Sequence, residues 1–531
     1  MLKLRNVSKS YGLKEVLNNV TFSLEKGQKA ALVAPNGTGK STLLKIIAGI
    51  EKIDFGGMEI HKSIRLGYFP QELKLDAKGK VMDFIFRTAG IEEPERQKIE
   101  YKAKIMLSGF GFKEGIEDRK VEELSSGQKA KIALIAILMK GADLLLLDEP
   151  TNNLDLPSLI WLEDYLKSSE ISGIIVSHDR RFLDNVTQKV FSIDRETRRF
   201  KVINGKYSHF LENEERDEKR RMELYQAQVR EIERINVIVE EKKQDAEDGS
   251  KWERSDNDKM LQGYNRNKSG RSLRTAKVIG NRIKRMEILD KPVVKNLFNI
   301  PTYEIKNEGN TEIEAKHLVV GRGKVFKTEP IDLHIQFGKK ICIIGGNGEG
   351  KSTLIKTLLG ELKAVSGEIN IGGSVKLVNM SQEHELLPPD KSPVQFLSQM
   401  AGIGESNAYN LLTKFDFPEE QAKNKISTMS PGERARLILI YFAAKKANVL
   451  VLDEPTNHMD AEAVSALKEF LKTYTGSLIL ISHDRYFIEQ VKIDYFYRIE
   501  NGKFEKIPDF AEYLKENDSK AKKLIRVISR V

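Results

Sequence analysis

Three short motifs each occur twice in this chain, in the same order. APNGTGKST at residues 34–42 recurs as GGNGEGKST at 345–353, LLLLDEPTNNLD at 144–155 recurs as VLVLDEPTNHMD at 449–460, and IIVSHDRRF at 174–182 recurs as LILISHDRYF at 478–487. The copies are 311 residues apart at the first motif and 305 apart at the other two. Such a constant offset predicts two copies of one domain.

Length and composition limit what these two domains belong to. A chain of 531 residues is long enough for two or three domains, each with its own core. Its apolar runs are far shorter than the roughly 20 residues of a membrane helix, and the N-terminus lacks a secretion signal, so we expect a cytoplasmic protein without a membrane domain. The net charge of +10 favours a polyanionic partner. A single cysteine, Cys342, excludes a zinc or iron–sulfur cluster built from cysteines.

The first motif has the form of a phosphate-binding loop. In each copy a short β-branched run leads through glycines into a helical pattern, which predicts a buried parallel strand, a loop and a helix of an α/β domain. Backbone N–H groups of the loop can surround a phosphate, the lysine reaches the β- and γ-phosphates, and the following serine offers a hydroxyl to Mg²⁺. Ala34 stands where glycine is usual. The residues that we assign to ATP in the two loops are Ala34, Asn36, Gly37, Gly39, Lys40, Ser41 and Thr42, and Gly345, Asn347, Gly348, Gly350, Lys351, Ser352 and Thr353.

The second motif ends an apolar strand with two adjacent carboxylates. These are Asp148 and Glu149 in the first copy and Asp453 and Glu454 in the second. We expect each aspartate to hold the metal ion, directly or through water. Each glutamate is then placed to polarise the water that attacks the γ-phosphate, as a general base or an orienting acceptor.

With these residues in view, the sequence resembles the ATP-binding cassette (ABC) superfamily over both halves. A further motif supports the resemblance: LSSGQ at residues 124–128 and MSPGE at residues 429–433 match the family signature. The resemblance implies that the signature of each half closes over the ATP of the other half. The signature residues concerned are Ser125, Gly127 and Gln128, which would face Lys351, and Ser430, Gly432 and Glu433, which would face Lys40.

The resemblance also assigns roles to residues outside the phosphate-binding loops and the acidic pairs. Gln71 and Gln382 match the glutamine that approaches Mg²⁺ and the attacking water, and His178 and His483 match the switch histidine that contacts the γ-phosphate. Tyr11 matches the aromatic residue that stacks on adenine. The equivalent position of the second half holds Arg322, whose planar guanidinium can also stack. The signature itself departs from the family pattern, because Ser126 and Pro431 replace its usual third glycine. Proline has no N–H to offer a phosphate, yet with both glutamates present we predict two competent sites.

Between the halves the composition changes sharply. From Tyr207 onward the chain is highly charged, and apolar residues recur at helical spacing, which predicts a long amphipathic helix. A second helical pattern follows Gly270, and the two apolar stripes are expected to pack as an antiparallel hairpin with an irregular tip at about residues 245–269. The apolar positions are Met222, Tyr225, Val229, Ile232, Ile235 and Val239 on the first limb, and Leu273, Ala276, Ile279, Ile283 and Met286 on the second.

The second limb is strongly basic. Residues 265–285 carry eight lysines and arginines and no acid. A solvated helix face is one interpretation of such a stripe. Mutual repulsion without compensating acids favours contact with RNA instead. The residues that we assign to RNA contact are Lys268, Arg271, Arg274, Lys277, Arg282 and Arg285.

Two complete cassettes joined by a charged helical linker resemble the ABC-F family. The resemblance implies a monomeric ATPase with ATP and Mg²⁺ as cofactors, whose halves pair intramolecularly. It also implies docking at the ribosomal E site, with the linker directed at tRNA and the peptidyl-transferase centre. A housekeeping translation factor and a drug-resistance protein that protects ribosomes both fit, and an ATP-binding subunit of a transporter is the alternative. We expect domains at residues 1–205, 206–300 and 301–531.

Overall fold

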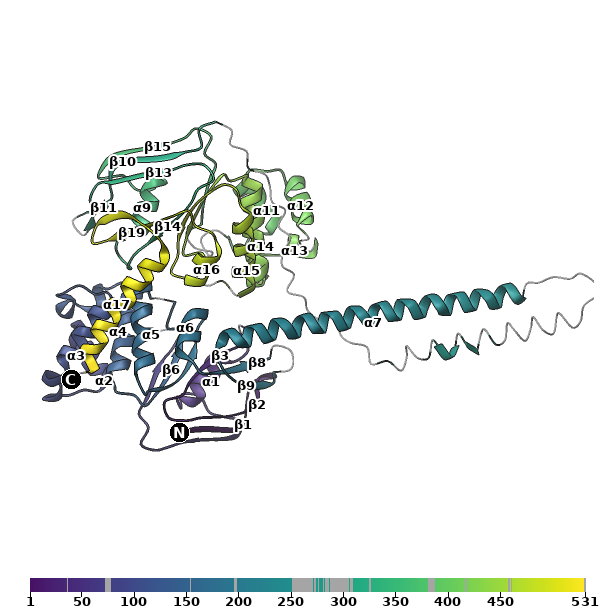
Figure 1. Cartoon of the computed structure of the whole chain (residues 1–531), viewed down its shortest axis with the longest axis horizontal. Coiled ribbons are helices and arrows are strands. Elements are labelled where there is room, and N and C mark those ends of the chain that lie inside the picture. Colours follow the sequence, from purple (N-terminus) through teal and green to yellow (C-terminus); the bar gives the residue numbers. More distant parts are fainter. Residues whose placement is uncertain are drawn as a thin grey trace, which may run out of the picture. The chain divides into compact units, whose positions relative to one another are not determined.

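The structure of the chain is a computed structural model (Figure 1). It describes residues 1–529 apart from residues 36, 72–77, 153, 195–197, 251–270, 272–273, 276, 280, 282–285, 287–304, 306–308, 324–325, 381–386, 416, 418, 457–458 and 460. The chain divides into two compact units. One unit holds both cassettes, in residues Met1–Ser208 and Leu297–Val531, and the other comprises His209–Asn296.

The first cassette is built on a six-stranded sheet with the order β5-β6-β7-β3-β8-β9. All neighbouring strands are parallel except β8 and β9. The strands are β3 (Lys29–Val33), β5 (Leu66–Phe69), β6 (Leu144–Asp148), β7 (Ser172–Val176), β8 (Lys189–Ile193) and β9 (Phe200–Asn204). The central strands are buried along their whole length, as their runs of Leu, Ile and Val require.

A three-stranded antiparallel sheet and six helices complete this cassette. The sheet has the order β2-β1-β4, with β1 (Leu2–Tyr11), β2 (Lys14–Leu24) and β4 (Phe55–Ile60). The helices are α1 (Lys40–Ile47), α2 (Val81–Ala89), α3 (Glu95–Gly109), α4 (Ser126–Met139), α5 (Leu156–Ser168) and α6 (Arg180–Val186), with short 3-10 turns η1 (Ile116–Asp118) and η2 (Val121–Glu123). One apolar core joins the two sheets to α1, through residues such as Leu4, Phe22, Leu44 and Leu146.

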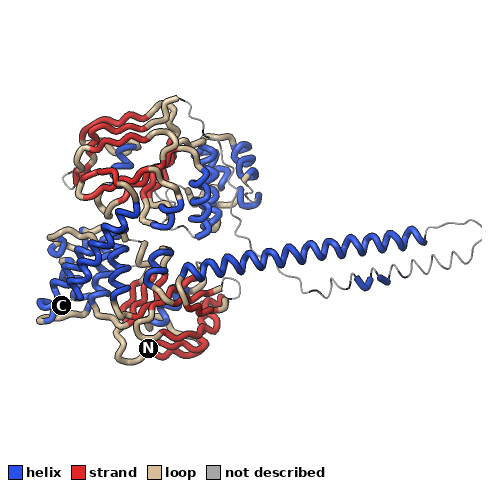
Figure 2. The backbone as a smooth tube through the Cα atoms, in the orientation of Figure 1, coloured by secondary structure: helices blue, strands red, loops and turns tan. Residues whose placement is uncertain are grey.

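The second cassette repeats this plan. Its larger sheet has the order β16-β17-β18-β14-β19-β20 and its smaller one β13-β10-β15 (strands red in Figure 2). The strands are β10 (Ile313–Val319), β13 (Ile331–Ile335), β14 (Lys340–Ile344), β15 (Ser366–Ile371), β16 (Leu377–Met380), β17 (Val449–Asp453), β18 (Ser477–Ile481), β19 (Tyr495–Glu500) and β20 (Lys503–Ile507), with a hairpin of β11 (Gly321–Arg322) and β12 (Phe326–Lys327). The helices are α9 (Lys351–Leu358), α11 (Pro393–Ala401), α12 (Glu405–Lys414), α13 (Glu419–Lys423), α14 (Pro431–Lys445), α15 (Ala461–Thr473), α16 (Arg485–Gln490) and α17 (Phe510–Ser529), with the turn η3 (Ile426–Thr428). The predicted pair of tandem α/β domains is confirmed.

The other unit contains α7 (Tyr207–Ser250), a single helix of 44 residues, except for its first two residues. It begins where the sequence predicts and extends about one and a half turns into the expected tip. The six apolar positions that the periodicity assigns to its inner face are all buried or half-buried. Of the second limb, the structure describes helical residues 271, 274–275, 277–279 and 281, and the expected tip from residue 251 onward lies outside the described residues.

Helix α17, near the end of the chain, packs on α5 of the first cassette (Figure 1). Asp164 on α5 is only 9% exposed, and one of its carboxylate oxygens is buried without a hydrogen-bond partner among the described residues. Burial, together with the nearby charge of Asp518 on α17, raises the pKa of Asp164 to about 6. At neutral pH the fold therefore holds a carboxylate that it stabilises poorly.

We expect Asp164→Asn to raise the stability of the protein at pH 8. A carboxyl whose pKa is raised in the folded state stabilises the fold below the unfolded value near 4, and this contribution is lost as the pH rises through about 6. The amide should therefore gain about 1–2 kcal/mol at pH 8 and little at pH 4.5. Thermal unfolding of both proteins at the two pH values measures the difference. The exposed Glu170→Gln should change neither, and a gain that did not depend on pH would contradict the explanation.

Candidate functional site

The repeated motifs meet at one edge of each large sheet. The phosphate-binding loop follows β3, the acidic pair ends β6, and His178 follows β7, and these three strands are neighbours in the parallel part of the sheet. The carboxyl ends of parallel strands point to the same edge, so the order β6-β7-β3 brings the three motifs together. Strands β17, β18 and β14 do the same in the second cassette. We call the site with Lys40 the first site and the site with Lys351 the second site.

Each phosphate-binding loop turns through glycines into a helix. Gly39 and Gly350 are the N-caps of α1 and α9, with φ of 101° and 103°, which is a left-handed conformation that glycine adopts without strain. A Cβ atom on Gly39 would also lie 2.7 Å from the Val16 side chain. The lysine amino groups fold back on their own loops, 2.7 Å from the Ala34 carbonyl oxygen in the first site and 2.8 Å from that of Gly345 in the second.

The structure explains why alanine is tolerated at the start of one loop only. Gly345 has a φ of 153°, and a Cβ there would collide with the carbonyl oxygen of Ile499. Ala34, at the matching position, packs against the apolar core of the first cassette. The departure from the usual glycine therefore does not argue against the first site.

The serine and aspartate expected to hold Mg²⁺ lie together in each site. Asp148 is buried, and one of its carboxylate oxygens has no hydrogen-bond partner among the described residues. Its carboxylate also forms a hydrogen bond with the Ser41 hydroxyl. Ser352 and Asp453 form the same pair in the second site. Burial raises the pKa of both aspartates, so a cation is the natural partner for their charge. One hydroxyl and one carboxylate suit Mg²⁺, which keeps several waters and is shared with substrate phosphates.

The two catalytic glutamate candidates have an unusual backbone. Glu149 and Glu454 have φ of 52° and 51°, and their N–H groups donate to the last strand residues Val176 and Ile481 at 2.9 Å. A left-handed conformation costs a residue with a Cβ about 1 kcal/mol or more, so the surrounding structure must hold it in place. Burial raises the pKa of each glutamate to about 7, although the nearby charge of the phosphate-loop lysine acts in the opposite direction.

The switch histidines lie beside these glutamates. The Nε2 atom of His178 is 3.2 Å from Glu149, and that of His483 is 3.3 Å from Glu454. The second site is more enclosed than the first, because the His483 side chain is only 14% exposed, whereas that of His178 is 50% exposed. Burial, followed by the charge of Lys351, lowers the pKa of His483, so this ring is neutral.

Both signature motifs begin a helix with a capping box. The Ser125 hydroxyl accepts from the Gln128 N–H at the start of α4, and Ser430 and Glu433 are paired in the same way at the start of α14. Pro431 occupies the first turn of α14, where the N–H that proline lacks would have no helical partner. Each signature therefore offers a fixed helix N-terminus, which favours an anionic group such as a phosphate.

One contact between the cassettes was not predicted from the sequence. Asp155, the N-cap of α5, accepts a hydrogen bond at 2.7 Å from the backbone N–H of Asn347 in the phosphate-binding loop of the second site. Its carboxylate is also 2.8 Å from the Lys131 amino group, and both side chains are at most 5% exposed. Burial alone would raise the pKa of Asp155, but the charge of Lys131 and the hydrogen bonds from Asn347 and Lys131 contribute together to a pKa below its usual range. The only signal in the sequence was the aspartate that ends the LLLLDEPTNNLD motif.

The remaining predicted residues are placed unevenly. Tyr11 ends β1 at the tip of a hairpin and is 47% exposed, so its ring is accessible for stacking. Arg322 lies in β11, but its side chain is outside the described residues, as are Asn36 and Gln382. Gln71 is exposed directly after β5. Of the residues assigned to RNA, Arg271, Arg274 and Lys277 are exposed, whereas Lys268, Arg282 and Arg285 lie outside the described residues.

Comparison with known proteins decides the family. The family model described as "ABC transporter" matches residues 17–152 and 328–457, once in each cassette. ABC transporter F family member 2 of Arabidopsis thaliana is 30% identical over 99% of this chain and 80% of its own length. The chain belongs to the ABC-F family. The probable ATP-binding protein YheS of Escherichia coli K12, 30% identical over 95% of this chain and 80% of its own length, is a further similar protein.

Membership of the ABC-F family establishes the overall reaction. This ABC-F protein binds ATP and hydrolyses it to ADP and phosphate. Among solved structures, its fold is similar to that of an archaeal ribosome recycling factor, aABCE1, in complex with the ribosomal stalk protein aP1, with a TM-score of 0.59 and 19% identity over 93% of this chain and 87% of that one. It is also similar to the RNase-L inhibitor, with a TM-score of 0.60 and 18% identity over 95% and 90%. Across the described parts of the ABC-F chain, no helix is both long and apolar enough to cross a membrane.

Proposed function

We propose that each site works with the residues that its motifs bring together. Mg²⁺, bound between Ser41 and Asp148 or between Ser352 and Asp453, would neutralise charge on the β- and γ-phosphates. Gln71 and Gln382 would approach the ion and the attacking water. Glu149 and Glu454 accept the proton of that water or orient it, and His178 and His483 contact the γ-phosphate. The distances of 3.2 and 3.3 Å between histidine and glutamate support this assignment.

The two sites form between the cassettes when ATP is bound. Each ATP is then held by the phosphate-binding loop of one cassette and the signature of the other, so that Lys40 faces Ser430 and Gly432 while Lys351 faces Ser125 and Gly127. The hydrogen bond of Asp155 to the Asn347 N–H supports this pairing, because it already brings the first cassette to the second phosphate-binding loop. A γ-phosphate contacted from both sides stabilises the closed state, and its hydrolysis permits opening.

In its closed state the protein binds the ribosome at the E site and acts on tRNA and the peptidyl-transferase centre through its linker. The observation that carries this proposal is α7, a helix of 44 residues between two complete cassettes. At 1.5 Å per residue such a helix is about 65 Å long, which suits contact with a distant part of a large assembly. The solved structures with a similar fold include one titled as ribosome-bound archaeal Pelota and ABCE1, with a TM-score of 0.58.

RNA contact is assigned to the basic second limb. Arg271, Arg274 and Lys277 are exposed and lie at helical spacing, so their charges are available to phosphates. The protein serves either as a translation factor or as a ribosomal protection protein that confers antibiotic resistance. Both activities need the same docked state and differ in what the linker displaces. With these assignments the domains are residues 1–205, 206–300 and 301–531.

Sedimentation of a hydrolysis-deficient variant tests the ribosomal function. Glu149→Gln, Glu454→Gln protein is expected to close on ATP and to co-sediment with ribosomes in a sucrose gradient, whereas ADP should release it. Imaging of the complex would locate the linker. Adding Arg271→Gln and Arg274→Gln should weaken binding and lower its dependence on salt, by nearly one unit of log slope for each lost phosphate contact.

The same gradient distinguishes the alternative, an ATP-binding subunit of a transporter. Such a subunit would show ATPase activity stimulated by a membrane partner and not by ribosomes. If the double variant sedimented with ribosomes no better than the unaltered protein, and ATP made no difference, the ribosomal function would be wrong. The arginine variant then serves as a control for non-specific attraction of a basic protein to RNA.

A further inference from the structure

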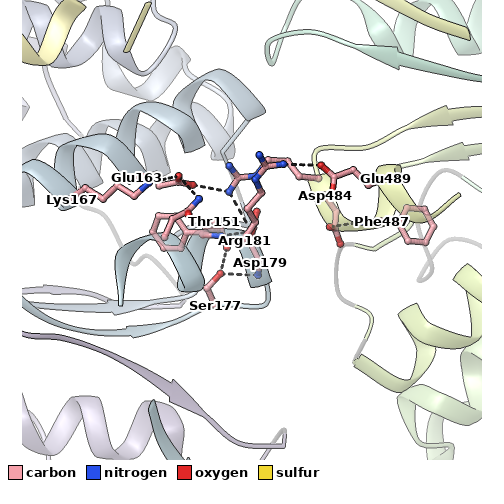
Figure 3. A network of polar contacts seen from close by, with 12 residues as sticks. Thr151, Glu163, Lys167, Ser177, Asp179, Arg181, Asp484, Phe487 and Glu489 are labelled. Atoms are coloured by element: carbon pink, nitrogen blue, oxygen red, sulfur yellow. Dashed lines mark hydrogen bonds and ion pairs between the residues drawn. The ribbon is translucent and has the colours of Figure 1, made fainter. Parts of the chain in front are cut away.

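A buried arginine of the second cassette lies between two carboxylates of the first. Arg485 begins α16, and a nitrogen of its guanidinium is 2.8 Å from Glu163 on α5 and 3.4 Å from Asp179, the N-cap of α6. Figure 3 shows Glu163 and Asp179 among the residues of this polar network. The Arg485 side chain is 3% exposed and that of Glu163 7%. Charges so far removed from water depend on each other, because losing one partner leaves the other uncompensated.

Glu163 is a fixed acceptor in this pair. One of its oxygens accepts from the amide of Asn185 at 2.6 Å and from Lys167 at 3.2 Å, which leaves the other oxygen for Arg485. A second, more exposed ion pair between the cassettes lies nearby, with Arg181 and Glu489 2.8 Å apart (Figure 3). The two pairs together join α5 and α6 to α16.

The Glu163 half of the Arg485 bridge has no counterpart on the other side of the repeat, although Asp484 corresponds to Asp179. At the offset of 305 residues, Arg180 corresponds to Arg485, but Lys468 corresponds to Glu163, so a lysine stands where the acid would be needed. Arg180 and Lys468 instead both lie over the ring of Tyr486, 4.8 and 5.5 Å from its centre. The Arg485–Glu163 pair therefore has no equivalent in which an arginine of the first cassette meets a glutamate of the second.

Both ends of this connection are next to a catalytic loop. Asp179 directly follows His178, which lies 3.2 Å from Glu149 in the first site. Arg485 is two residues after His483, whose N–H donates to Glu454 at 3.3 Å in the second site. A displacement of either histidine loop therefore moves one member of the buried ion pair.

Helix α5 adds a second connection to the same pair of sites. Asp155 at its start accepts from the phosphate-binding loop of the second site, and Glu163 two turns later holds Arg485. The helix is thus attached to the second cassette both at the nucleotide and behind its switch histidine. A structural change at the second ATP site can therefore be transmitted through α5 to Glu163 and Arg485, and from Arg485 to Asp179.

We propose that Arg485, held by Glu163 and Asp179, is a positioning residue that couples the two ATP sites. It joins the two switch-histidine loops, so that the occupancy of one site changes turnover at the other. Separating the loops exposes buried charges together, and the pair therefore favours two discrete arrangements over a continuous range. The inference concerns ATP hydrolysis and does not depend on the ribosomal function.

The test compares ATP hydrolysis at the second site between a protein whose first site holds ATP and a protein whose first site is empty. Glu149→Gln leaves the first site able to hold ATP, and Lys40→Ala prevents ATP from binding there, so that only the second site turns over in either protein. With the bridge intact, we expect kcat or KM of the second site to differ between the two proteins by roughly fivefold or more. Adding Arg485→Gln to both should bring the ratio to about one. Phosphate release over a range of Mg-ATP concentrations measures it.

Two further variants show whether the ratio reports this bridge. Glu163→Gln removes the charge from the acceptor side, should also bring the ratio to about one, and carries the test if Arg485→Gln does not fold. Arg180→Gln, the matched change in the first cassette, should leave the ratio as it was. A merely local role for Arg485 would change both rates alike and keep the ratio. Persistence of the ratio without Arg485 or Glu163, its equal loss with Arg180→Gln, or its absence while the bridge is intact would overturn the proposal.

Discussion

The double variant Glu149→Gln, Glu454→Gln is expected to lose ATP hydrolysis by on the order of 100-fold or more while it still binds ATP. Glu149 is buried and Glu454 is half-buried, and each has a left-handed backbone conformation beside a histidine at the switch position. An amide of the same size keeps this geometry and can still contact water, but it cannot accept a proton. Steady-state phosphate release measures the loss, and a fluorescent ATP analogue measures binding.

The control for this prediction is a carboxylate outside both sites. Glu170→Gln removes an exposed charge and should leave hydrolysis as it was. If the double variant kept its rate within about tenfold, the glutamates would not be the groups that activate water. If ATP binding disappeared as well, the loss of hydrolysis would reflect a damaged site and not a missing base.

The parts of the sites that the sequence predicts are those in which chemistry requires a residue type at a fixed place along the chain. A lysine after glycines, or Asp-Glu after an apolar strand, has a local reason to occur, and a parallel sheet brings the ends of such strands together. The order β6-β7-β3 and its repeat β17-β18-β14 confirm that expectation. The helix α7 was equally predictable, because the period of its apolar residues is a local property.

Contacts between the cassettes were not predictable in this way. Asp155 and Asn347 are 192 residues apart, and Arg485 and Glu163 are 322 apart, and no periodicity relates positions so distant. The internal repeat does not predict the Arg485–Glu163 pair either, because the position that corresponds to Glu163 is Lys468. The three-dimensional structure is therefore needed to show that the two cassettes contact each other through different residues.

Departures from the family pattern are explained by packing that the sequence does not display. Pro431 leaves α14 intact because proline suits the first turn of a helix, although it still offers no N–H to a phosphate. Ala34 is tolerated because the clash that excludes a side chain at Gly345, with the carbonyl of Ile499, belongs to the second cassette. Both cases show that a motif position is constrained by its neighbours in space as well as by its ligand.

Asp155→Ala is expected to destabilise the protein by about 3–5 kcal/mol, because it leaves the buried Lys131 ammonium without its carboxylate. Lys131 retains hydrogen bonds to the Phe110 carbonyl and the Ser158 hydroxyl, but neither carries a compensating charge. The same change removes the N-cap of α5 and the acceptor for Asn347. Asp155→Asn preserves the cap and separates the effect of charge from that of capping. Thermal or urea unfolding measures each variant.

A matched pair on the surface shows that burial is the cause. Lys80 and Asp118 are 2.9 Å apart, against 2.8 Å for Lys131 and Asp155, but their side chains are 58% and 75% exposed. Asp118→Ala should therefore change stability very little, since water replaces the lost partner.

The decisive variant is Lys131→Met, Asp155→Asn, which removes both buried charges. If charge compensation is what the pair supplies, this double variant must be more stable than the Asp155→Asn single variant. Additive losses would instead mean that Lys131 and Asp155 contribute through separate packing contacts.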